Sequence, residues 1–94
     1  MEAGLTVRLR RRIVLDFDVD VEEIEHVLES VDSANQDRER MLAAVVLGAA
    51  GDVGVFRELA ELSHVDWRDL LVAGGLADAT WANTLNRELG PPSE

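Results

Sequence analysis

The sequence predicts an α+β fold that is predominantly helical, with one long N-terminal β-strand, about residues 5–17, followed by four or five short helices. Residues 5–17 alternate between apolar and polar side chains, and apolar residues recur at helical spacing from about residue 20 onwards. Of the 94 residues, 47% are hydrophobic, which suits one folded domain over 1–94. We expect residues 1–4 and 91–94 to be flexible.

The predicted strand reads LTVRLRRRIVLDF, and its odd positions are apolar apart from Arg11. Val14 is the second exception, because it is apolar among the polar even positions. A helix is the alternative interpretation, since four apolar residues are also spaced four apart: Leu5, Leu9, Ile13 and Phe17. We favour the strand because Val7 and Leu15 fit the alternation better than they fit a helix.

The first predicted helix covers about residues 21–31. Asp20 followed three residues later by Glu23 fits a capping box. The apolar residues after it fall on one helical face, and they are Val21, Ile24, Val27, Leu28 and Val31. Ser33 with Gln36 is a second capping-box candidate, and it precedes the next helix.

That next helix, about residues 35–50, is apolar on nearly all sides from its middle onwards, which predicts that it is the central buried helix. Gly51 is expected to end it. Three shorter helices follow, and each begins after an aspartate that can cap it: Asp52, Asp66 and Asp78. Glycines and prolines are expected to end the last two of them.

A single strand leaves unpaired backbone groups along both edges, so we expect it to pair antiparallel with the same strand of a second copy. The charges favour a register centred near Ile13, because Arg10 then faces Asp16, whereas a shifted register places Arg10 opposite Arg12. The predicted interface consists of Val7, Leu9, Arg10, Arg11, Ile13, Leu15 and Asp16. A second strand elsewhere in the chain, or a different partner protein, is the alternative.

The charge of the chain excludes several functions. The net charge is −10, and it is segregated, with +3 on residues 1–15 and −8 on residues 16–32. This acidity argues against direct nucleic-acid binding, and no apolar run is long enough to span a membrane.

The absence of cysteine excludes disulfides and thiolate zinc sites. All nine basic residues are arginine, which indicates a high-G+C bacterial genome, and we expect a cytoplasmic protein.

Three aspartates follow the predicted strand as D-F-D-V-D: Asp16, Asp18 and Asp20. This spacing resembles the signature of the haloacid dehalogenase superfamily, which would imply metal-dependent phosphoryl transfer, and also the start of an EF-hand loop. The Gly-Thr that continues the first motif, and the glycine and glutamate that complete the second, are missing here. We therefore interpret the aspartates as a strand end and a helix cap, and we expect no metal, no cofactor and no catalytic residue.

Two further motifs point to structure more than to function. His26 and His64 provide too few ligands for a zinc site. Residues 56–76 fit two helices joined by a turn, as in DNA-binding proteins, but Asp66 and Asp69 would repel phosphates.

The remaining candidates are surface residues: the acids Glu22, Glu25 and Glu29, and the aromatic pair Trp67 and Trp81. Acidic faces attract basic partners, and tryptophan is enriched both in small cores and at interfaces. The sequence therefore predicts a small, non-enzymatic, acidic protein–protein interaction module of unknown pathway, homodimeric, with an unidentified partner protein. The alternative is an acidic mimic of nucleic acid that occupies a nucleic-acid-binding protein. A metal-dependent phosphoryl-transfer enzyme ranks third.

Overall fold

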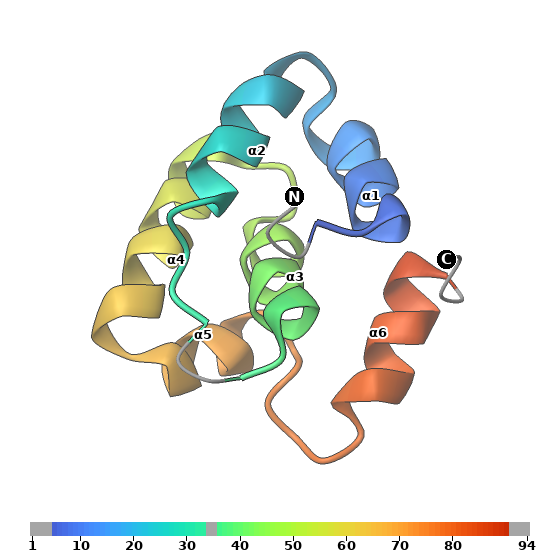
Figure 1. Ribbon diagram of the computed structural model, residues 1–94, viewed down its shortest axis with the longest axis vertical. Coiled ribbons are helices and arrows are strands. Elements are labelled where there is room, and N and C mark those ends of the chain that lie inside the picture. Colours follow the sequence, from blue (N-terminus) through green and yellow to red (C-terminus); the bar gives the residue numbers. More distant parts are fainter. Residues whose placement is uncertain (1–4, 34–35, 91–94) are drawn as a thin grey trace.

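The computed structural model describes residues 5–33 and 36–90, and within these ranges it is all-helical and contains no strand (Figure 1). The elements in chain order are α1 (Val7–Phe17), the 3-10 turn η1 (Asp18–Asp20), α2 (Val21–Leu28), α3 (Arg38–Ala49), α4 (Val53–Val65), α5 (Trp67–Ala73) and α6 (Trp81–Leu89). The flexibility expected of 1–4 and 91–94 concerns residues outside the described ranges.

The predicted α+β class and its N-terminal strand are wrong, because this segment forms α1. Leu9 and Ile13 are both 0% exposed, and Phe17 completes a buried series at four-residue spacing. Val7 and Leu15, which favoured the strand, are 64% and 78% exposed. The apparent alternation therefore came from apolar residues on the solvent side of a helix.

Specific contacts explain where α1 begins and where it ends. The side chain of Thr6 accepts a hydrogen bond from the backbone N–H of Leu9 at 3.3 Å, which caps the first turn. At the other end, the ring of Phe17 meets the ring of Phe56 in α4 edge to face, with 5.5 Å between centroids. Asp18 then takes a positive φ of 52°, which ends the helix and turns the chain toward α2.

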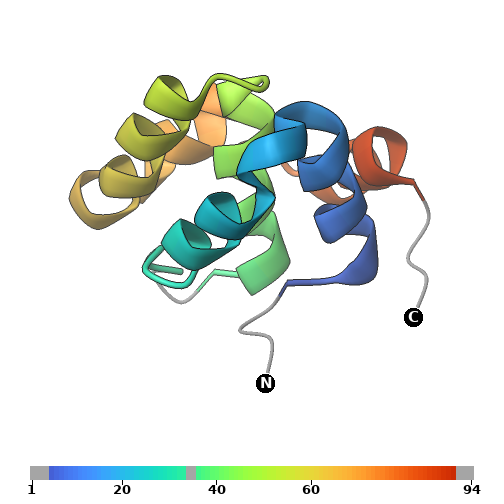
Figure 2. The same cartoon turned by 90° about the horizontal axis from the view of Figure 1, so that it is seen from above.

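Helix α3 is the central buried helix, as the sequence predicts, and residues 41–46 are all buried. Figure 2 shows α4 and α6 on opposite sides of it. Asp37 caps α3, and not the predicted Ser33, because the Asp37 carboxylate accepts the N–H of Arg40 at 3.0 Å. The helix ends at Ala50, which adopts a left-handed conformation with φ 50°, one residue before the expected Gly51.

The predicted aspartate caps are partly confirmed. Asp52 and Asp66 cap α4 and α5 by accepting backbone N–H groups at 3.1 and 3.3 Å. Thr80, and not Asp78, occupies the capping position of α6, and Asp20 precedes α2 without a side-chain capping bond. The two confirmed caps fix where α4 and α5 begin, and α5 carries the candidate site.

Helices α3 and α5 approach so closely that a glycine is required between them. A Cβ added at Gly74, the residue after α5, would lie 2.5 Å from the Cα of Ala44 in α3. The chain then returns along a loop to α6, which packs against α1 and α3 (Figure 1). None of the helices in the described ranges combines the length and apolar character that crossing a lipid bilayer requires.

Candidate functional site

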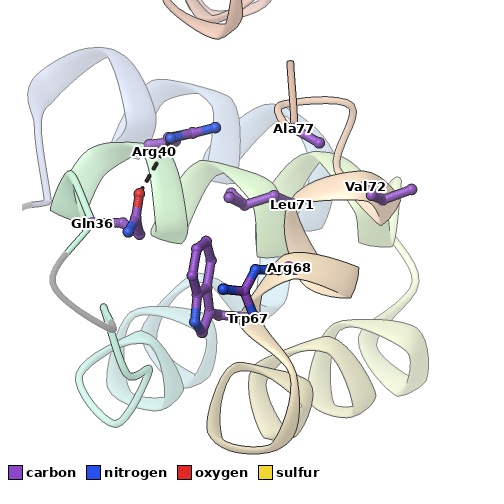
Figure 3. Close-up of a pocket in the computed structure, with 7 residues that line it drawn as sticks. All are labelled: Gln36, Arg40, Trp67, Arg68, Leu71, Val72 and Ala77. Atoms are coloured by element: carbon purple, nitrogen blue, oxygen red, sulfur yellow. Dashed lines mark hydrogen bonds between the residues drawn. The ribbon is translucent and has the colours of Figure 1, made fainter. Parts of the chain in front are cut away.

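Carboxylates within the described ranges neutralise five of the nine arginines. The pairs are Arg8–Glu39, Arg10–Glu25, Arg12–Asp16, Arg57–Glu23 and Arg87–Glu88. Acidic residues outnumber basic ones by 19 to 9, so an arginine without a carboxylate neighbour is unexpected here. Arg40 and Arg68 form no ion pair within 5–33 and 36–90, and both line the same hollow (Figure 3).

The hollow lies between the beginning of α3, helix α5 and the loop that follows α5. Its volume is about 350 Å³, and its lining residues are Gln36, Arg40, Trp67, Arg68, Leu71, Val72 and Ala77. In the view of Figure 3, Trp67 and Arg68 lie on one side and Gln36 and Arg40 on another, with Leu71 between them. The site thus combines two guanidinium groups, an indole ring and an apolar floor.

Helix α5 provides most of the lining because of its residue spacing. Trp67, Arg68, Leu71 and Val72 stand at positions i, i+1, i+4 and i+5, which share one side of a helix. Leu71 is buried in the core, whereas Val72 is exposed. The hollow is therefore closed by the core at its floor and open to solvent at its rim.

Arg40 is held in place by neutral groups. Its Nε and Nη2 atoms both donate to the carbonyl oxygen of Leu76, at 3.1 and 2.9 Å, and Nη1 donates to Gln36 at 3.4 Å. Its guanidinium also lies 4.8 Å from the centroid of the Trp81 ring. These contacts fix the side chain, but they leave its positive charge without a carboxylate among the described residues.

Arg68 is exposed at the rim, and its guanidinium stacks 4.7 Å from the centroid of the Trp67 ring. It donates no hydrogen bond to the part of the chain that the structure describes. Its planar set of donors is therefore available to an anionic ligand, while the stacking limits the orientations that it can adopt.

Arg8, unlike the two arginines of the hollow, is paired with a carboxylate among the described residues, and its role is structural. Its Nε and Nη2 atoms donate to the Glu39 carboxylate at 2.8 and 2.7 Å, and Nη1 donates to Asn86 at 2.6 Å and to the carbonyl of Gly90 at 2.9 Å. Hydrogen bonding within this pair raises the pKa of Arg8 and lowers the pKa of Glu39. The group joins α1, α3 and α6, and four of its five N–H donors are used in these contacts.

The predicted partner surface is divided in the structure. Glu22 and Glu29 are exposed on or next to α2, whereas Glu25 accepts a hydrogen bond from an arginine of α1 at 3.0 Å. Trp67 lines the hollow, whereas Trp81 contacts it only through the stacking of its ring with Arg40. Helix α2 packs against α1 and α4, away from α5 and α6 (Figure 1), so the acids and the tryptophans do not form one surface.

The predicted strand-pairing interface does not exist. Leu9 and Ile13 lie in the chain's own core, and Arg10 and Asp16 form ion pairs within the same chain. The other three interface residues are exposed: Val7, Arg11 and Leu15. Because α1 is a helix whose backbone groups bond to one another, it has no open strand edge to offer to a second copy.

The aspartates at the end of α1 and in η1 do not converge on a metal site: Asp16, Asp18 and Asp20. Within the described ranges, no group of three His, Asp or Glu side chains is placed to hold a metal ion. Both carboxylate oxygens of Asp16 accept from Nε of Arg12 at 3.1 Å. His26 and His64 are exposed on two different helices, α2 and α4.

A second hollow, of about 430 Å³, lies between α2 and α4. Its lining residues are Val27, Ser30, Arg57, Ala60, Glu61, His64 and Val65. Arg57 already pairs with Glu23, so this hollow has a neutralised cation and no tryptophan. The hollow beside α5 is therefore the stronger candidate for a binding site.

Sequence reasoning missed Arg40 and Arg68, although it selected Trp67. The sequence around Arg68 has no acidic residue three or four positions away, but most other arginines of the chain share this feature, so it could not have singled out Arg68. The role of Arg40 depends on the loop carbonyl of Leu76, which only the tertiary structure brings near. Comparison of the chain with known protein families, with curated proteins and with solved structures gives no match.

Proposed function

We propose that this chain is a non-enzymatic protein–protein interaction module that binds an acidic segment of a partner protein in the hollow between α3 and α5. The observation that supports this most directly is the pair of arginines, Arg40 and Arg68. They line one hollow without a carboxylate partner in the described ranges, in a chain whose net charge is −10. An acidic side chain from outside is the complement that this site lacks.

The chemistry of the hollow fits a short peptide segment. A partner carboxylate at the rim would form charge-assisted hydrogen bonds with the free donors of Arg68. An apolar side chain beside that carboxylate would cover Trp67 and Leu71. Tryptophan and arginine are the residues that dominate binding energy at interfaces. The volume of about 350 Å³ is small for a ligand pocket, and it suits one or two side chains.

The proposal is tested by adding capped peptides to isotope-labelled protein and following the signals by NMR. The probe is a Leu-Glu-Leu-Glu peptide, and its matched control is Leu-Gln-Leu-Gln, which has the same shape without the charge. We expect the acidic peptide to shift the indole N–H signal of Trp67 and the side-chain signal of Arg68. We expect the amide peptide to shift them much less, because it cannot neutralise a guanidinium.

Variants assign the binding to the hollow. Arg68→Glu should abolish binding of the acidic peptide, whereas Leu15→Asp, on the exposed side of α1, should leave it unchanged. Equal affinity for the charged and amide peptides, or unchanged binding by Arg68→Glu, would contradict the proposal.

The same experiment separates this proposal from an acidic nucleic-acid mimic. A mimic would bind a basic peptide, Leu-Lys-Leu-Lys, through α2 and would shift the signals of Glu22 and Glu29. Helix α2 supports that alternative less strongly, because Glu23 and Glu25 already pair with arginines of the same chain. Strong binding of the basic peptide together with an unchanged indole N–H signal of Trp67 would favour the mimic.

A further inference from the structure

The outward face of α1 is an exposed apolar stripe. Val7, Val14 and Leu15 are 64%, 47% and 78% exposed, and they are three of the six exposed large hydrophobic side chains in the described ranges. They stand at positions i, i+7 and i+8, so they share one side of the helix. The opposite side of α1 is in the core, which leaves this stripe as the free surface of the helix.

Val14 and Leu15, at the C-terminal end of this stripe, have a charge on either side, one of each sign. Arg11 is exposed, three residues before Val14, and forms no ion pair or hydrogen bond with the described residues. Asp18, the first residue of η1 directly after α1, is exposed three residues after Leu15, and it also forms no ion pair with the described residues. The arrangement is symmetric along the chain about the Val14–Leu15 bond, with opposite charges at equal distances.

We infer that α1 packs antiparallel against α1 of a second copy, about a two-fold axis that passes between Val14 and Leu15. In this register Val14 of each copy faces Leu15 of the other. Arg11 of each copy faces Asp18 of the other, so two ion pairs flank one apolar centre. A two-fold interface requires such a self-complementary surface, because the same residues must serve on both sides.

A second copy fits this face better than an unrelated protein does. A register that places Arg11 opposite Arg11 would bring like charges together, so the charges select the arrangement centred on Val14 and Leu15.

An eleven-residue helix is about 16 Å long. Two such helices bury less than the ~1,200 Å² typical of stable complexes, so we expect a weak dimer. Helix α1 does not pack against α5, so both surfaces can be occupied together (Figure 1).

The test is sedimentation velocity between about 10 μM and about 1 mM protein, a range that covers weak dimers. The wild type should associate as concentration rises. Arg11→Asp and Asp18→Arg should each stay monomeric, because the facing positions then carry like charges. An equimolar mixture of these two variants should form a heterodimer, since one chain supplies two acids and the other supplies two arginines.

Controls separate this inference from a folding defect and from the peptide site. Asp18 has a positive φ, so Asp18→Asn, which tolerates that conformation, should also weaken the dimer while circular dichroism confirms the fold. Leu15→Asp should abolish association, and Arg68→Glu should preserve it. A wild type that is monomeric throughout, single variants that associate like the wild type, or a mixture that stays monomeric would each overturn the inference.

Discussion

At the scale of single residues, the partner of each guanidinium decides what an arginine does in this chain. Arg8 is buried and donates four hydrogen bonds, two of them to Glu39. Arg40 is fixed by a carbonyl oxygen, the Gln36 side chain and an aromatic ring, whereas Arg68 stacks on an aromatic ring of the described residues. Side chains of one type are therefore divided between holding helices together and offering charge to a ligand.

Replacing Glu39 with Gln should destabilise the fold. The change leaves the buried Arg8 guanidinium without its anionic partner, and we expect a loss of about 2–3 kcal/mol in the free energy of unfolding. Urea unfolding followed by circular dichroism measures it. Glu61→Gln, at an exposed position in α4, is the matched control and should change stability by less than about 0.5 kcal/mol. Equal stability of the two variants would contradict a structural role for this pair.

The same pair gives a pH dependence with a definite sign. The pKa of Glu39 is lower in the folded protein than its ordinary value of 4.5, so the contribution is complete above that value. The stabilisation that the Arg8–Glu39 pair provides is lost as the pH falls through the lowered pKa of Glu39 in the folded state. The stability difference between the wild type and Glu39→Gln should therefore be constant near neutral pH and shrink in acid. A difference that grows on acidification would contradict this assignment.

At the scale of elements, the sequence predicts what local chemistry determines. The Asp52 and Asp66 caps are confirmed because a cap involves only the next few residues. The central helix is confirmed because its apolar run is long. Residues 5–17 were assigned wrongly because two periodicities fit the same letters, and burial of Leu9 and Ile13 by the rest of the fold decided between them.

The close approach of α3 and α5 gives a prediction about one glycine. Gly74→Ala should destabilise the protein by roughly 2 kcal/mol, because the added methyl group would meet backbone atoms of Ala44, which cannot move aside. Gly54→Ala in α4 is the matched control, since its methyl group would meet only the Asp52 side chain at 3.3 Å. Urea midpoints of both variants provide the measurement. A Gly74→Ala protein as stable as Gly54→Ala would contradict the packing described here.

The candidate site could be predicted only in part, because it joins elements that are distant in the chain. Trp67 was selected from its residue type alone. Arg40 belongs to α3 and Arg68 to α5, and no local pattern indicates that they line one hollow. The acids of α2 looked equivalent in the sequence, but two of them face arginines of other helices, which the sequence does not reveal.

At the scale of the whole molecule, the net charge of −10 is not distributed evenly. Internal ion pairs neutralise much of the basic charge, whereas Arg40 and Arg68 in the hollow beside α5, and Arg11 on the outer face of α1, have no carboxylate partner among the described residues. Acidic proteins attract basic partners in general, but our proposals assign acidic ligand groups to these two places. In the proposed function, the general acidity disfavours non-specific association with acidic partners, and the local cations would provide specificity.

Recognition of a carboxylate by Arg68 is measured by a double-mutant cycle. Calorimetry gives four affinities: wild type and Arg68→Gln, each with Leu-Glu-Leu-Glu and with Leu-Gln-Leu-Gln. We expect an interaction free energy of about 1 kcal/mol, or roughly fivefold in affinity, as for a solvent-accessible ion pair. Effects that simply add, with no interaction between Arg68 and the peptide carboxylates, would contradict the account.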